Sequence, residues 1–398
     1  MARSKLLLFC ALAAEVVTAH SHHREAEDLQ QPVVGWTRED LDAKWGTDWG
    51  FSGISTFAHL EHSRCLQYPE TEYDIAILGV PFDTAVSYRP GARFGPRAIR
   101  HASARQTAFR GYNPRAHLNP YQEWAKIIDC GDIPVTPFDN ALALRQMTEA
   151  FTNLAHAKAP AENAKSTITY RQTPKLLTLG GDHSIALPTL RALNKIYGNV
   201  AVVHFDAHLD TWHPAKYPNA WIDKDDPNEQ SFFTHGTMFW VAHNESLIMK
   251  DKSVHAGLRT RLSGQGDNED DDAQGWTRIA CDDIDDLGAT GIVKKIVSQV
   301  GTETPVYLSI DIDVIDPGLA PGTGTPEPGG WTTRELIRVL RGIESLNVVG
   351  ADIVEVSPAY DGSGEVTALA AAQVAFEVLT SMVRRGMLDR GEAGRDEL

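Results

Sequence analysis

The sequence predicts an α/β fold of three layers, in which helices cover both faces of a mostly parallel central sheet. Short apolar runs that stop at Gly, Asp or His are typical of buried parallel strands. Segments with the apolar period of a helix separate these runs, and such alternation implies a parallel sheet covered on both sides. We expect strands at residues 74–80, 175–179, 200–205, 306–310 and 348–353, and helices at 140–156, 185–197, 291–300, 333–346 and 367–385.

The 398 residues contain neither an internal repeat nor a Pro/Gly/Ser-rich linker, so one main domain is the simplest organisation. The formal net charge of −16 argues against a nucleic-acid partner, which needs a basic surface. This charge suits a small cationic substrate, although an acidic balance also serves solubility alone. After the N-terminus no stretch approaches 18 uncharged apolar residues, so we expect no membrane span in the mature protein.

Residues 1–19 have the layout of a secretory signal peptide. Two basic residues precede an apolar run at 6–14, and residues 17–19 place small side chains at a cleavage site. The apolar run is too short to span a bilayer. An ordinary buried N-terminal helix is the alternative interpretation of the same residues.

The remaining chain is expected to divide into three parts. Residues 20–65 form a polar, histidine-rich leader that becomes an arm, residues 66–390 form the main domain, and residues 391–398 form a tail. The last four residues, RDEL, resemble the ER-retention tetrapeptides. Together with the signal peptide they predict a protein of the secretory pathway, either in the ER lumen or outside the cell.

Three cysteines, Cys65, Cys130 and Cys281, remain once Cys10 has left with the signal peptide. Their odd number and the absence of a CxxC spacing fit neither a disulfide framework nor a cysteine zinc site. At most one bridge can form, and the sequence does not tell which cysteines pair.

Two acidic stretches, residues 212–233 and 264–275, are expected to be surface loops because of their composition. The first follows directly after a candidate metal motif. We therefore expect it at the rim of the site.

Four segments at predicted strand ends carry the candidate chemistry. They are Leu179-Gly180-Gly181-Asp182-His183-Ser184, His204-Phe205-Asp206-Ala207-His208-Leu209-Asp210-Thr211, Ser309-Ile310-Asp311-Ile312-Asp313-Val314-Ile315-Asp316-Pro317 and Val354-Glu355-Val356-Ser357-Pro358. In an extended backbone, residues two apart point to the same side. If the chain stays extended, Asp206, His208 and Asp210 therefore project together. Asp311 and Asp313 do likewise, and all would meet His183 at the carboxyl edge of the sheet, where such folds bind ligands.

Four carboxylates at that spacing repel one another and need compensation. Two divalent cations would supply it, and carboxylate and imidazole ligands without a thiolate favour Mn²⁺ over Zn²⁺. In the alternative interpretation no metal is bound, and the aspartates cap helices while the histidines pack in the core. Ligand-type residues at alternate positions in two strand ends favour the metal site.

These segments resemble the ureohydrolase family, which includes arginase and agmatinase, over residues from about 75 to 382. Residues 87–100, SYRPGARFGPRAIR, resemble the agmatinase branch. Without the family, this segment reads as a basic glycine loop entering a helix, which suggests anion binding or a subunit contact. The resemblance implies an arginase-like sheet of about eight strands and two Mn²⁺ ions per subunit.

The resemblance also implies the ligands of each ion. The first would take His183, Asp206, Asp210 and Asp311, and the second Asp206, His208, Asp311 and Asp313. Asp206 and Asp311 would bridge the two ions. Hydrolysis would then use a water whose pKa the metal ions lower.

Three residues are expected to act in catalysis. Asp210 would orient the attacking oxygen of that water. His235 would move protons, since an imidazole titrates in the useful range, although a lone loop histidine is often structural. Glu355 would accept hydrogen bonds from a guanidinium group. His235 and Glu355 are thus the expected substrate-binding residues.

The resemblance favours agmatine as substrate, cleaved to putrescine and urea, because acidic residues near the rim would disfavour the carboxylate of arginine. Arginase and guanidinobutyrase activity remain alternatives on the same site. A manganese-binding protein without turnover is the alternative of another class. The expected partners are a small cationic guanidino compound and copies of the same chain, in a trimer or a hexamer.

Overall fold

The computed structural model describes residues 37–46, 49–160, 173–214 and 232–392. The chain divides into two compact units, residues 1–47 and 48–398. In the first unit, helix α1 spans Arg38–Trp45. The second unit contains all other described elements. The expected signal peptide, the histidines of the leader and the RDEL tail lie outside the described residues.

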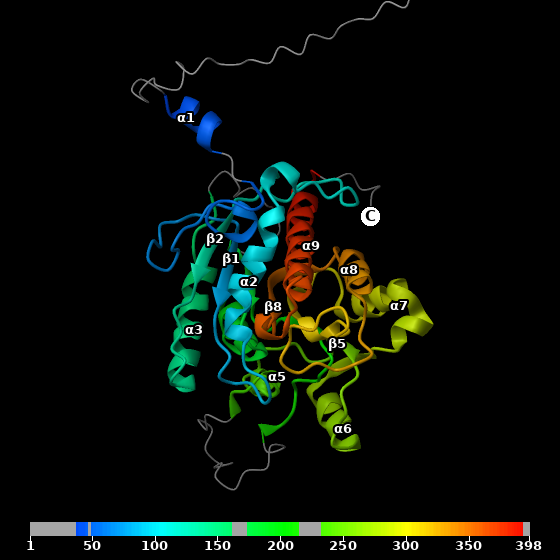
Figure 1. Ribbon diagram of the computed structural model, residues 1–398. Coiled ribbons are helices and arrows are strands. Elements are labelled where there is room, and N and C mark those ends of the chain that lie inside the picture. The colour runs from blue at the N-terminus through cyan, green and yellow to red at the C-terminus, as the bar shows by residue number, and fades with distance from the viewer. Residues whose placement is uncertain (1–36, 47–48, 161–172, 215–231, 393–398) are drawn as a thin grey trace, which may run out of the picture. The chain divides into compact units, whose positions relative to one another are not determined.

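The larger unit is built on one sheet of eight parallel strands (Figure 1). The strands run in the order β2-β1-β3-β8-β7-β4-β5-β6 across the sheet. Their bounds are β1 Ile75–Val80, β2 Ile127–Asp132, β3 Lys175–Gly180, β4 Ala201–Phe205, β5 Ser253–Leu258, β6 Trp276–Ala280, β7 Pro305–Asp311 and β8 Asn347–Val354. This confirms the predicted α/β class and the implied number of strands.

Helices cover both faces of the sheet. Residues of α2, α7, α8 and α9 pack in the core on one face, and residues of α3, α4 and α5 pack in the core on the other face. The bounds are α2 Gly95–Ala102, α3 Asn140–Ala155, α4 Ala186–Tyr197, α5 Met238–Asn244, α6 Gln265–Gln274, α7 Asp283–Val300, α8 Thr333–Gly342 and α9 Val366–Asp389. Each of the five predicted helices overlaps one of these elements.

Two hydrophobic cores, one on each face, explain the three layers. Ile75 and Ile77 of β1 join the core formed with α7, α8 and α9. Ala76 and Leu78 of the same strand join the core formed with α3, α4 and α5. Because successive side chains of a strand point to opposite faces, an uninterrupted apolar run can serve both cores.

The structure corrects the prediction at one acidic stretch and adds strands to the prediction. Residues 264–275 were expected as a surface loop, but they form helix α6, whose left-handed C-cap is Gly275. Asp271 of this helix is fully buried. Strands β2, β5 and β6 are additional to the five strands that the sequence analysis predicted. The other acidic stretch lies largely outside the described residues.

Helix α9 is the one described helix that is long and apolar enough to cross a membrane. However, 78% of its most apolar window is buried inside the domain. Ala371, Val374 and Leu379 pack into the core on the face shared with α8. This burial is the pattern of a core helix.

A disulfide joins Cys65 to Cys130, across 65 residues of sequence. Cys65 precedes β1 and Cys130 lies in edge strand β2, while the remaining thiol, Cys281, is buried. Residues expected in the arm therefore pack with the main domain. Phe57 is fully buried, and the backbone N–H of Ser63 donates to the carbonyl of Asp129 over 3.0 Å.

We expect Cys130→Ser to lower the free energy of unfolding by about 2–4 kcal/mol, because the open chain of this loop length gains conformational entropy. Chemical denaturation under non-reducing conditions measures the change. The buried Cys281→Ser is the control that leaves the bridge intact. Three titratable thiols in the denatured, unreduced mature protein would contradict the bridge.

Candidate metal centre

The predicted site residues come from strand ends that are neighbours in the sheet. His183 follows β3, Glu355 follows β8, Asp311 ends β7 and Asp206 follows β4. These four strands are adjacent in the order β3-β8-β7-β4. Since all strands are parallel, their carboxyl ends lie at one edge, and the side chains meet there.

Glycines allow the backbone to pack closely at this edge. A Cβ on Gly181 would lie 2.3 Å from the carbonyl oxygen of Phe82. The backbone N–H of Glu355 donates to the carbonyl of Gly181 over 2.9 Å, which ties the end of β8 to the segment before His183. Because a Cβ has no room here, the second position of the Gly-Gly pair in the first motif requires glycine.

The two Asp-rich motifs turn, and the predicted extended backbone is wrong there. The N–H of His208 donates to Oδ1 of Asp206 over 2.6 Å, and the N–H of Asp313 donates to Oδ1 of Asp311 over 2.8 Å. Both are aspartate turns that close on the backbone two residues later. Asp210 lies in the left-handed region, with φ of 54°. The residues still converge, but they do so through turns.

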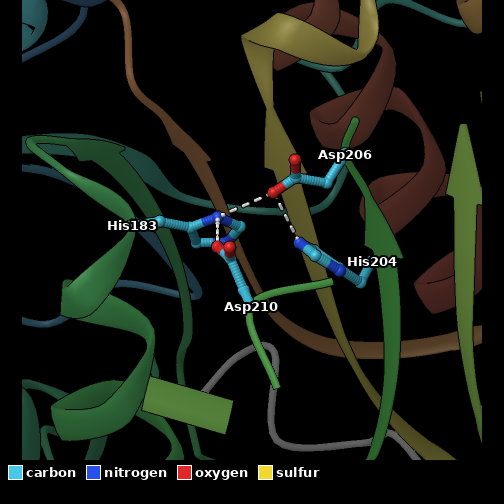
Figure 2. Close-up of side chains that lie close together, drawn as sticks. All are labelled: His183, His204, Asp206 and Asp210. Atoms are coloured by element: carbon cyan, nitrogen blue, oxygen red, sulfur yellow. Dashed lines mark hydrogen bonds and ion pairs between the residues drawn. The ribbon is translucent and has the colours of Figure 1, made fainter. Parts of the chain in front are cut away.

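His183 lies at the centre of the first group of candidate ligands. Its Nδ1 is 3.1 Å from Oδ2 of Asp206 and 3.0 Å from Oδ2 of Asp210 (Figure 2). Oδ2 of Asp311 lies 3.5 Å from the same nitrogen. His183, His204, Asp206 and Asp210 each offer an atom within 4.8 Å of the others, close enough to hold one cation.

A second group shares Asp206. His208 places Nδ1 3.2 Å from Oδ1 of Asp206 and 3.1 Å from Oδ2 of Asp313. The ligand atoms of Asp206, His208 and Asp313 also lie within 4.8 Å of one another. The two groups, joined by Asp206, thus contain five of the six predicted ligands, together with His204, which was not predicted. The sixth, Asp311, lies beside His183 but belongs to neither group, so the bridging role implied for it stays a prediction.

The electrostatics of the site call for cations. Burial, together with the charges of Asp313 and Asp206, raises the pKa of Asp311 well above its usual value. Burial and the charge of Asp206 raise the pKa of Asp313 to about 6. Burial opposes ionisation of Asp206 too, but the charge of His204 and hydrogen bonds from neighbouring imidazoles hold its pKa well below the usual value. Divalent cations would neutralise the negative charge of these crowded carboxylates, so the donor set fits a two-metal site.

Buried partners to which the sequence analysis gave no role orient the ligands. Nε2 of His183 is 2.7 Å from Oγ of Ser309, and this hydroxyl donates to Oδ1 of Asp352 over 2.8 Å. This contact leaves Nδ1 of His183 facing the carboxylates. On the other side, Nε2 of His204 is 2.8 Å from Oδ2 of Asp206 (Figure 2). Polar residues inside apolar strands were the available signal, since buried polar groups require partners.

Glu355 and His235 lie beside the candidate ligands. Oε1 of Glu355 accepts from the N–H of His183 over 2.9 Å and lies 3.1 Å from Nδ1 of His235. The hydrogen bonds that the described residues make to Glu355 fall on Oε1. Oε2 is therefore available to a ligand. Burial disfavours the charged ring of His235, but Glu355 outweighs it and raises the pKa of this imidazole to about 9.

Ser87 contacts the other nitrogen of His235. Its backbone N–H donates to Nε2 over 2.9 Å, and its Oγ lies 2.8 Å away. The amide suits the neutral ring, and the hydroxyl can accept from the protonated ring. Because a protonated Nε2 cannot accept from this amide, the backbone contact favours a ring without a proton on Nε2 and opposes the effect of Glu355. This contact gives a role to the loop at residues 87–100, for which anion binding or a subunit contact had been considered.

Two of the predicted catalytic residues have strained backbones. Asp210 has φ of 54° and Glu355 has φ of 61°. Non-glycine residues in this region cost about 1–3 kcal/mol and persist where the surroundings hold them, often at functional sites. In this backbone conformation the carboxylates of Asp210 and Glu355 both contact His183.

Comparison with known proteins agrees with this geometry. The arginase family model matches residues 73–380, most of the chain. The chain belongs to the arginase family. An agmatinase homologue from Schizosaccharomyces pombe is 44% identical over 390 residues, which cover 96% of this chain and 95% of the relative. The agmatinase of Proteus mirabilis is 40% identical, covering 82% of this chain and 92% of that protein.

Solved structures of the arginase family share the fold. The proclavaminate amidino hydrolase of Streptomyces clavuligerus superposes with a TM-score of 0.71 at 35% identity, covering 85% of this chain and 100% of that one. A hypothetical agmatinase from Burkholderia thailandensis gives a TM-score of 0.70 at 33% identity, covering 86% and 93%. These relatives support a ureohydrolase enzyme of the agmatinase branch, as the motifs predicted.

We expect Asp206→Asn to abolish tight binding of divalent metal, because both groups of ligands lose the carboxylate that they share. Metal content after dialysis, measured by elemental analysis, tests this. Asp251→Asn, on a turn outside the site, is the control. An Asp206→Asn protein that keeps the wild-type metal content would contradict the assignment.

We expect His235 to titrate near pH 9 in the metal-free protein, because Glu355 stabilises its protonated ring. In Glu355→Gln this stabilisation is lost, so the pKa of His235 should fall, and the ring should lose its proton at a lower pH. Nuclear magnetic resonance of the ring nitrogens measures both titrations. An unchanged titration in the variant would exclude Glu355 as the cause.

Proposed function

We propose that this ureohydrolase cleaves agmatine into putrescine and urea at the carboxyl edge of its sheet. The supporting observation is that Glu355 and His235 lie next to the two groups of metal ligands. A protein that only stored metal would need neither of them. High identity to agmatinases over most of the chain supports the same substrate.

Glu355 is suited to bind the guanidinium group. Its side chain is 1% exposed, and Oε1 is already used by His183 and His235. Oε2 can accept hydrogen bonds from the planar N–H groups of the substrate. The guanidinium carbon would thereby be held near the metal ligands.

Asp210 and His235 are suited to handle protons. Asp210 lies within the first group of ligands, where it can orient an attacking water. When bound, the metal ions would lower the pKa of that water. His235, whose Nδ1 lies 3.1 Å from Oε1 of Glu355, can deliver a proton to the departing amine and regain one from solvent.

We propose manganese as the metal. Carboxylate and imidazole ligands without a thiolate suit Mn²⁺ better than Zn²⁺. The two groups sharing Asp206 support two ions per subunit. The family resemblance supports the same metal, and it is also the ground on which we propose a homo-oligomer, a trimer or a hexamer.

We propose that the protein enters the secretory pathway. The N-terminal sequence supports this, and so does the disulfide between Cys65 and Cys130, because such bridges persist in oxidising compartments. The RDEL sequence at residues 395–398 would retain the protein in the ER lumen, and secretion is the alternative. Immunostaining of the full chain, compared with a chain that lacks the last four residues, separates the two destinations.

We expect urea release from agmatine to exceed release from arginine and 4-guanidinobutyrate when the protein is loaded with Mn²⁺. Chelation should abolish it. Glu355→Gln should keep its metal and lose at least about 100-fold in kcat/KM, since a buried charged hydrogen bond to the substrate is removed. No urea from any guanidino compound would favour the non-catalytic alternative. A higher rate with arginine or guanidinobutyrate would reassign the substrate.

A further inference from the structure

A row of polar residues crosses the sheet one layer beneath the metal ligands. Register pairs Thr178 with Asp352, Asp352 with Ser309, and Ser309 with His204. The row continues from His204 to His255 and from His255 to Arg278. It therefore spans six neighbouring strands, from β3 to β6. In parallel strands, residues in register point to the same face, so these side chains form one continuous layer.

Hydrogen bonds connect the outer half of this row. Nε2 of His204 faces Oδ2 of Asp206 at 2.8 Å, and its Nδ1 faces Nδ1 of His255 at 2.7 Å. Nε2 of His255 lies 3.2 Å from Oδ1 of Asp271. Both nitrogens of each ring are engaged, so neither ring can turn without losing two contacts.

Aromatic side chains enclose the two imidazoles. The indole of Trp276 stacks on His255, with ring centroids 4.0 Å apart and an interplanar angle of 16°. Phe239 meets His204 edge-on at 4.9 Å. Both imidazoles are fully buried. With water excluded, the hydrogen bonds to Asp206 and Asp271 determine how these rings lie.

Asp271 of helix α6 anchors the row at its outer end. Besides His255, it accepts from Oγ1 of Thr211 over 2.7 Å and from Nη1 of Arg278 over 2.7 Å. Thr211 directly follows Asp210 in the second motif. Asp271 therefore reaches the metal ligands by two routes, through His255 and His204 to Asp206, and through Thr211 to the turn that carries Asp210.

We propose that Asp271 is a positioning residue of the metal centre, which fixes Asp206 through the two histidines and Asp210 through Thr211. Helix α6, at the periphery of the domain in Figure 1, thus sets how tightly the metal is held. This inference rests on the proposed two-metal site. Groups that orient metal ligands from behind commonly change metal affinity about 10- to 100-fold.

The test compares two neighbouring aspartates. Asp271→Asn keeps the shape of a buried carboxylate and removes its charge, and we expect its affinity for Mn²⁺ to fall about 10- to 100-fold. Asp272→Asn makes the same chemical change on the same helix. Its carboxylate also pairs with Arg278, at 2.8 Å, but it is 59% exposed. We expect this control to bind Mn²⁺ within about two-fold of the unchanged protein.

Affinity is measured by competition with a fluorescent chelator, on protein that circular dichroism shows to be folded without metal. If Asp271→Asn does not fold, Thr211→Val removes one route alone, and its affinity should fall about 10-fold. If Asp271→Asn folds and its Mn²⁺ affinity is unchanged, the proposal is overturned, and Asp271 is a stabilising core residue. If Asp271→Asn does not fold, an unchanged Mn²⁺ affinity in Thr211→Val overturns the proposal in the same way. If the wild-type protein binds no Mn²⁺, the proposed metal centre itself is overturned, and this inference with it.

Discussion

The structure depends on the repulsion among four carboxylates that the chain buries at one edge of its sheet. Asp206, Asp210, Asp311 and Asp313 are between 0% and 6% exposed. Such a group of charges is stable only with compensating positive charge, and imidazoles supply part of it. The negative charge that the imidazoles leave unbalanced makes this edge suited to divalent cations. Burial is thus the source of function here, because it makes the carboxylates bind what neutralises them.

The fold meets this demand with layers of decreasing polarity. The ligands lie on turns after the strands, where the backbone can adopt unusual angles. The next layer, inside the strands, is polar, and His204 and Ser309 are hydrogen-bonded there, whereas the buried hydroxyl of Thr178 makes no hydrogen bond to the described residues. Beyond it the strands are mostly apolar and join the two cores. A turn that must hold a strained residue such as Glu355 needs this rigid base, because strain persists only where the surroundings over-determine the backbone.

Much of this arrangement was predictable from the sequence, and the remainder was not for physical reasons. The apolar runs predicted β1, β3, β4, β7 and β8, because strands buried on both faces have no polar alternation. Strand β6 was not predicted because Thr277 and Arg278 interrupt its apolar pattern. Helix α6 was predicted as a loop because so many of its residues are acidic. Motif spacing predicted that the six candidate ligands would lie close together, but not the turns that bring them there. The role of Asp271 depends on which strands are neighbours, and that information is non-local.

The bridge between Cys65 and Cys130 has a consequence at the edge of the sheet. Outer strand β2 would otherwise expose unpaired backbone groups to other chains. Instead, the N–H of Asp129 donates to the carbonyl of Glu61 over 2.8 Å, and His62 pairs with Asp129 as a short parallel bridge. The disulfide fastens this segment one residue further along β2. The disulfide thus holds this border of the sheet closed against edge-to-edge pairing with other chains.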